Sequence, residues 1–154
     1  MRREDFELDA SQIGWVDSGA DPAQPTVTID FHGEATQLRE RLSDGAGGFL
    51  DADETDVAFR LRESDEEPPS GVVAVTDRLT GDFVFELNVD ADDVFRFVEA
   101  AREYGKRTGD THYRVVIRED GEELLTYEKD TFLVYNEEGD LLRSKSVIPS
   151  GVEL

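Results

Sequence analysis

The sequence has no cysteine, only three lysines among its 16 basic residues, and one tryptophan in 154 residues. The absence of cysteine excludes disulfide bonds, thiolate zinc sites and cysteine nucleophiles. Apolar runs are short, and none approaches the roughly 18 residues of a membrane-spanning helix. Arg2 and Arg3 follow the first methionine, but no apolar segment comes after them, so a secretory signal is not expected. These features predict a soluble, cytoplasmic protein.

What the sequence has in excess is negative charge: 37 acidic residues stand against 16 basic ones, for a net charge of −21. Nine phenylalanines and several β-branched runs give the chain a core to bury, which an acidic disordered tail lacks. A folded, evenly acidic chain with arginine in place of lysine is typical of a protein adapted to molar salt, where the screening length falls to about 3 Å. The alternatives are a basic partner or bound divalent cations. Nucleic acid and anionic membranes are not expected to bind directly, because both need cationic neutralisation.

The pattern of apolar residues predicts an α+β fold, a mainly antiparallel sheet with two helices packed on one face. Strands are expected at residues 5–10, 26–31, 56–62, 72–75, 83–87, 113–117, 124–127, 132–135 and 141–148. We expect a single domain over 1–154, with an N-terminal arm (1–25) and a C-terminal tail (149–154). The order strand, helix, strands occurs twice, beginning at residues 26 and 83, which suggests a pseudo-repeat.

The helices are expected at residues 34–43 and 91–104. In the second helix, Asp90 is placed as the N-cap and Gly105 as the residue that ends it. Its apolar stripe predicts that Phe97, Val98 and Ala101 face the sheet. The residues expected beneath them are Val73, Val75, Phe85 and Val115.

No motif identifies a catalytic residue, a cofactor site or a metal site. The two histidines, His32 and His112, would form a carboxylate–histidine site only if the fold brought them together; otherwise they are ordinary surface residues. The acidic segment 51–56 resembles a calcium loop, but Asp56 stands where that loop needs glycine and Arg62 where it needs glutamate. This excludes an EF-hand and leaves a loose cation cluster.

Two aromatic residues are candidate contacts for a partner protein. Trp15 either plugs the edge of the sheet or is exposed as part of a partner site. Phe95 lies off the apolar stripe of the second helix and poses the same question. With no catalytic constellation, the leading hypothesis is a non-catalytic protein-interaction or regulatory module. The rival is a small-molecule or metal-binding protein, or an enzyme, built on carboxylates and histidine.

Taken whole, the chain resembles a family of small haloarchaeal proteins of unknown function over nearly its full length. The residues that carry this resemblance are Gly14-Trp15-Val16, Thr26-Val27-Thr28, Thr55-Asp56-Val57-Ala58-Phe59-Arg60, Gly71-Val72-Val73-Ala74-Val75-Thr76, Thr80-Gly81-Asp82-Phe83 and Ile148-Pro149-Ser150-Gly151-Val152-Glu153-Leu154. The resemblance implies no activity, cofactor or catalytic residue.

A second resemblance concerns element order alone. Two strand–helix–strands units are similar to one domain of a DNA sliding clamp. Such a clamp turns basic helices towards DNA, whereas the charged residues counted in helices 34–43 and 91–104 balance to neutral and to slightly acidic. A clamp-like, DNA-associated domain is therefore a third hypothesis, and fold alone would not establish it.

Overall fold

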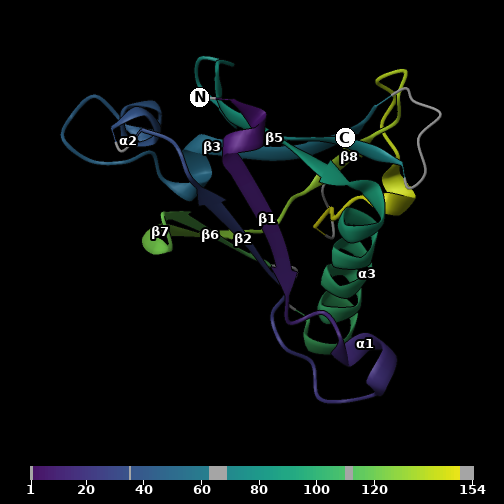
Figure 1. Cartoon of the computed structure of the whole chain (residues 1–154). Coiled ribbons are helices and arrows are strands. Elements are labelled where there is room, and N and C mark those ends of the chain that lie inside the picture. Colours follow the sequence, from purple (N-terminus) through teal and green to yellow (C-terminus); the bar gives the residue numbers. More distant parts are fainter. Residues whose placement is uncertain (1, 35, 63–68, 110–112, 150–154) are drawn as a thin grey trace.

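The computed structural model describes residues 2–34, 36–62, 69–109 and 113–149. The strands are β1 (Phe6–Ser11), β2 (Thr26–Phe31), β3 (Thr55–Leu61), β4 (Ser70–Asp77), β5 (Phe83–Asp90), β6 (Tyr113–Glu119), β7 (Glu122–Lys129) and β8 (Leu133–Tyr135). The α-helices are α1 (Trp15–Ser18), α2 (Gln37–Leu42) and α3 (Ala91–Thr108), and the short 3₁₀ helices are η1 (Arg3–Asp5), η2 (Ala52–Glu54) and η3 (Arg143–Lys145). Figure 1 shows their arrangement.

The strands form two sheets, each with one parallel pair. Sheet 1 has the order β1-β2-β6-β7, and sheet 2 has the order β5-β4-β3-β8. Neighbours pair antiparallel except β2 with β6 and β3 with β8. The predicted α+β class and the mainly antiparallel pairing are confirmed, but two sheets stand where one was expected. Residues 6–11, assigned to an N-terminal arm, form the edge strand of sheet 1.

Local sequence explains the strands well. In β2, Val27, Ile29 and Phe31 are buried and alternate with polar residues, because successive strand residues point to opposite faces. The turn between β6 and β7 is Asp120-Gly121, and both residues have positive φ (49° and 83°). A tight hairpin turn with this backbone favours Asp-Gly, which is the sequence present.

One contiguous core joins the two sheets. The ring of Phe6 in β1 lies 4.9 Å from that of Phe31 in sheet 1 and 4.8 Å from that of Phe85 in sheet 2. Phe97 of α3 is 2% exposed, and its ring centroid lies 5.2 Å from that of Tyr113 and 5.7 Å from that of Phe132. The predicted inward face of the second helix is confirmed, since Val98 and Ala101 are buried as well.

The second helix is longer than predicted. It continues through Gly105 to Thr108, and Gly109 ends it with a left-handed backbone (φ 78°). Glycine inside a helix costs about 1 kcal/mol relative to alanine. Contacts of the last turn offset this cost, because Arg107 pairs with Glu103 at 3.1 Å and packs over an indole ring from the N-terminal region.

The prediction of a final strand at 141–148 is wrong. This segment forms two isolated antiparallel bridges with the residues in and beside β8, Leu141 with Tyr135 and Val147 with Phe132. The helix η3 lies between the two bridges and interrupts the pairing. The side chain of Ser146 replaces part of the backbone hydrogen bonding that a regular strand pair would have. Its hydroxyl accepts the backbone N–H of Val134 at 2.9 Å and donates to the carbonyl of Leu142 at 2.8 Å.

The two longer helices lie at opposite ends of the molecule (Figure 1), and both contact β5 of sheet 2. They therefore form no common helical surface of the kind that a clamp-like domain would turn to DNA. The order strand, helix, strands does occur twice, but the two units pair differently. β2 is a central strand that pairs with β6, whereas its counterpart β5 lies at an edge of sheet 2.

Candidate functional site

Two rows of side chains cross the outer face of sheet 2, the face turned away from the core. The first row is Asn88, Val72, Arg60 and Tyr135, one residue from each of β5, β4, β3 and β8. The second row is Glu86, Ala74, Ala58 and Leu133, from the same strands in the same order. Val72, Ala74 and Ala58 are half-buried and form an aliphatic floor at the centre of both rows.

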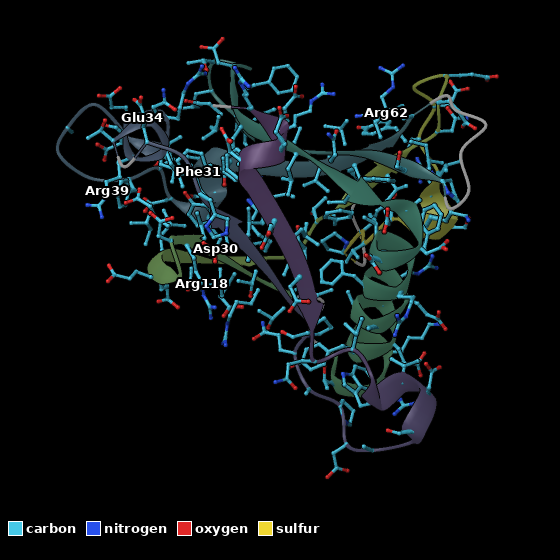
Figure 2. The ribbon with its side chains drawn as sticks, in the orientation of Figure 1. Asp30, Phe31, Glu34, Arg39, Arg62 and Arg118 are labelled. Carbon is cyan, nitrogen blue, oxygen red and sulfur yellow. The ribbon has the colours of Figure 1, made fainter. Side chains whose placement is uncertain are left out.

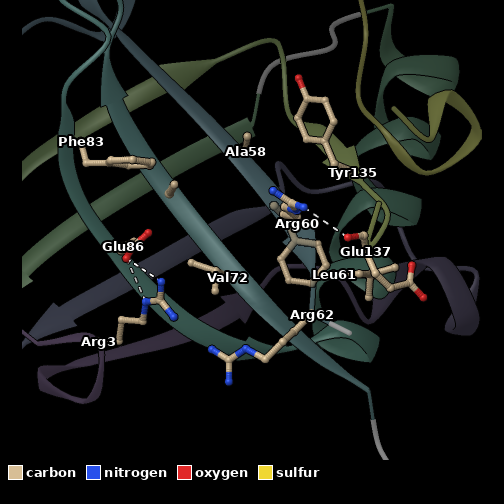
Figure 3. Close-up of a pocket in the computed structure, with 12 residues that line it drawn as sticks. Arg3, Ala58, Arg60, Leu61, Arg62, Val72, Phe83, Glu86, Tyr135 and Glu137 are labelled. Atoms are coloured by element: carbon tan, nitrogen blue, oxygen red, sulfur yellow. Dashed lines mark hydrogen bonds and ion pairs between the residues drawn. The ribbon is translucent and has the colours of Figure 1, made fainter. Parts of the chain in front are cut away.

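This aliphatic floor lies in an open depression of about 530 Å³. Phe83 and Glu86 of β5, with Arg3 of η1, border one side, and Arg60 and Tyr135 border the other (Figure 3). Nη2 of Arg3 lies 2.7 Å from the carboxylate of Glu86, so this ion pair neutralises the charge on its side of the depression.

Arg60 of β3 and Arg62, the residue that follows β3, carry the positive charge of this face. Nη2 of Arg60 donates to the carbonyl oxygen of Glu137 at 3.2 Å, and Arg62 donates to the side-chain oxygen of Asn88. Both side chains are exposed, and Arg62 projects away from the sheet (Figure 2). Among the residues that the structure describes, neither has a carboxylate at ion-pair distance. Since a guanidinium has five N–H donors, most of theirs are open to a ligand.

The outer face of sheet 1 provides a contrast. Its central strand β2 presents Thr26, Thr28 and Asp30 where β4 presents aliphatic residues. On the neighbouring strands, Nε of Arg114 lies 3.1 Å from the carboxylate of Glu128. That face is polar at its centre, and one of its arginines is paired with a carboxylate. In the described part of the chain, the outer face of sheet 2 combines apolar groups with arginines that have no carboxylate at ion-pair distance.

Two large apolar side chains of the described chain are strongly exposed, and both belong to the β4–β5 hairpin. Phe83 is 58% exposed and borders the depression, and Leu79 in the turn is 80% exposed. Scattered exposed leucines are common, but an exposed phenylalanine beside an aliphatic floor extends one apolar patch. The outer face of sheet 2 is therefore the best candidate site. The sequence signal for it was the unbroken apolar run Val72–Val75, which puts aliphatic residues on both faces of β4.

Trp15 lies elsewhere and is covered by the chain itself. It begins α1, is 6% exposed, and donates its indole N–H to the carbonyl of Gln12 at 2.5 Å. Its ring lies 6.4 Å from that of Tyr104, and the guanidinium of Arg107 lies 5.3 Å from its centroid. The indole plugs the end of α3 rather than the edge of a sheet. Its burial leaves little surface for the partner contact that we considered.

Phe95 of α3 is half-buried and packs against the edge of the core. Its ring lies 6.3 Å from that of Phe59, and Nζ of Lys145 lies 4.1 Å from its centroid. These contacts hold the ring in a groove between α3 and η3, which Arg102 also lines. A partner contact through Phe95 stays a prediction.

The structure does not unite the histidines into a described site. His112 lies outside the described residues. His32 is exposed, with its imidazole nitrogens 3.4 Å from Asp120, 3.7 Å from Glu7 and 3.9 Å from Asp30. Partial desolvation would lower the pKa of His32, but the hydrogen bond to Asp120 and the three negative charges outweigh it and raise that pKa above its ordinary value. His32 does not line the depression on sheet 2.

The acidic segment 51–56 has a local structural role. Carboxylate oxygens of Asp51, Asp53 and Glu54 lie within 4.8 Å of one another, but Glu54 also accepts the backbone N–H of Asp51 at 2.9 Å and so caps η2. Nζ of the buried Lys129 donates to the carbonyls of Ala52 and Thr55 and fixes the other side of this turn. Burial, together with the charge of a nearby arginine, lowers the pKa of Lys129. In the described chain, these carboxylates form a capped turn and give no further sign of a cation site.

None of the described helices is long and apolar enough to cross a membrane. Comparison with curated proteins and with solved structures gives no match. A family of unknown function (DUF5793), by contrast, matches residues 1–154. The chain belongs to this family.

Proposed function

We propose that the protein is a non-catalytic interaction module that binds a partner protein through the outer face of sheet 2. One observation carries this proposal: an aliphatic floor, an exposed phenylalanine and two arginines without a carboxylate partner among the described residues share one concave face. Protein interfaces are enriched in aromatic residues and arginine. The alternative of a carboxylate–histidine site has less support, because His32 is exposed and does not line the depression.

The aliphatic floor favours a binding role over a merely solvated surface. Strands that are apolar on both faces occur where both faces are covered. β4 has this composition, with Val73 and Val75 in the core and Val72 and Ala74 on the outer face. The inner pair is buried by the fold, whereas the outer pair is only half-buried. A partner that covers the outer pair would complete the pattern and remove this apolar area from water.

The proposal includes the setting in which the protein works. The net charge of −21 supports a cytoplasmic protein adapted to concentrated salt, where screening weakens repulsion within the fold and between the protein and its partner. An apolar floor suits such a setting, because salt does not screen the hydrophobic effect and strongly hydrated anions strengthen it. Charged contacts alone would weaken at high salt.

Photo-crosslinking tests the proposal. A benzophenone amino acid replaces Phe83, whose exposed ring leaves room for the larger side chain, and in a matched variant it replaces Thr28 on the outer face of sheet 1. In cells of the source organism, we expect a discrete adduct from position 83 that disappears when Ala74→Glu is added. Equal adducts from both positions, or an adduct that is insensitive to Ala74→Glu, would contradict the proposal.

A further inference from the structure

Building on the proposed function, we infer that the outer face of sheet 2 recognises an extended acidic segment of the partner with the pattern acid-x-acid-x-apolar. The inference rests on the order of side chains along β3 and the residue after it. Ala58 and Arg60 of β3 and then Arg62 line the same depression, and the N–H of Arg62 still bonds the carbonyl of Ser70 at 3.0 Å. These three residues are two positions apart, so they repeat about every 7 Å along one face.

An extended peptide that lies over this face has the same repeat, because its alternate side chains also point to one side. Two carboxylates at alternate positions of the peptide therefore face Arg62 and Arg60. The next alternate residue then lies over Ala58 and Ala74, where an apolar side chain fits. Arginine pairs with carboxylate through two parallel hydrogen bonds, which adds direction as well as charge.

The charges around the face support an acidic ligand. In a chain where acidic residues outnumber basic ones by 37 to 16, an arginine is expected to find a carboxylate neighbour. Arg3 has found one in Glu86, but Arg60 and Arg62 contact only neutral oxygens in the described chain. A partner's carboxylates would replace or join these neutral acceptors with bonds in which donor and acceptor are both ionised, and each guanidinium would pair with a carboxylate through two parallel hydrogen bonds.

A short protein segment fits this face better than nucleic acid does. Nucleic-acid binding depends on neutralising many phosphates in a row. Of the described residues around this depression, Arg60 and Arg62 are the two arginines without a carboxylate partner, whereas Glu86 and Glu137 lie around it too and would repel a longer polyanion. The aliphatic floor between them has no counterpart in a phosphate backbone, whereas it matches a leucine or valine side chain.

The test uses the whole chain labelled with ¹⁵N and the peptide Ser-Glu-Ser-Glu-Ser-Leu-Ser in low salt. We expect saturable shifts of backbone amides confined to β3, β4 and β8. The variants Arg60→Gln and Arg62→Gln should each weaken binding about tenfold, the equivalent of about 1.4 kcal/mol. Arg118→Gln, on the outer face of sheet 1, is the matched control and should leave binding unchanged. Both target side chains are exposed, and the spectra themselves show whether each variant is folded.

Three control ligands make the inference falsifiable. A peptide with glutamine in place of glutamate, and a scrambled peptide with adjacent glutamates, should bind much more weakly; equal binding of either would overturn the inference. Single-stranded DNA that shifts the same amides at lower concentration would also overturn it. If the peptide does not bind but a crosslinked adduct forms from position 83, the acidic pattern is wrong and the proposed function is retained. Failure of the crosslinking would overturn the proposed function itself.

Discussion

Replacing Phe97 with alanine should destabilise the fold more than any change on the outer side of α3. The side chain is 2% exposed and lies between Tyr113 of sheet 1 and Phe132 next to sheet 2. Phenylalanine-to-alanine changes in cores cost about 3–5 kcal/mol. Because each edge-to-face ring pair adds about 0.5–1.5 kcal/mol beyond burial, we expect a loss of about 4–5 kcal/mol here.

Urea unfolding followed by circular dichroism measures this loss, with the slope of the transition compared between variants. A total stability of about 5–15 kcal/mol leaves the variant folded only marginally, so Phe97→Leu serves as a milder companion with a cost below about 1.5 kcal/mol. Phe95→Ala is the matched control on the same helix. Its ring is half-buried, and we expect a cost of about 1–2 kcal/mol. If Phe95→Ala costs as much as Phe97→Ala, the orientation of α3 is wrong.

The remaining predictions concern salt, a histidine and a glycine. The melting temperature should rise by many degrees between about 0.1 M and 2 M KCl, because screening relieves repulsion among the 21 excess negative charges; a flat profile would mean that the acidity is not a salt adaptation. Folding raises the pKa of His32 above its ordinary value of 6.5. The protonated imidazole therefore stabilises the fold fully below pH 6.5, and this stabilisation is lost as the pH rises through the raised pKa. NMR titration should show that raised pKa, and Asp120→Asn should lower it; no change would contradict the assigned contact. Gly71→Ala should cost about 1–3 kcal/mol in urea unfolding, since its Cβ would clash with the carbonyl of Arg60, whereas Gly14→Ala, with open space around it, should stay within about 0.5 kcal/mol.

Elements defined by neighbours in sequence could be predicted, and pairings between distant elements could not. The alternation in β2 and the stripe of α3 predicted which side chains are buried, because a single periodicity determines them. The parallel pairing of β2 with β6 joins residues far apart in the chain, and no local pattern records it. The division into two sheets was missed for the same reason.

The errors at the level of residues also have physical causes. Gly105 is a natural end for a helix, but the contact of Trp15 with the last turn holds that turn in place. The apolar character of 141–148 suggested a strand, but the side chain of Ser146 bonds the backbone instead. The candidate site was visible only as the apolar run Val72–Val75. This run could indicate a binding surface only once the fold showed which face of β4 is left uncovered.

The central claim is that the outer face of sheet 2 binds a protein partner. The most direct measurement is calorimetric titration of the partner identified by crosslinking into Ala74→Glu and Thr28→Glu. Both substitutions place one carboxylate at a half-buried outward position on a central strand, one in each sheet. We predict that Ala74→Glu weakens binding at least about 100-fold, about 2.7 kcal/mol, and that Thr28→Glu leaves the affinity within about twofold. Equal effects of the two substitutions, or no effect of Ala74→Glu, would contradict the claim.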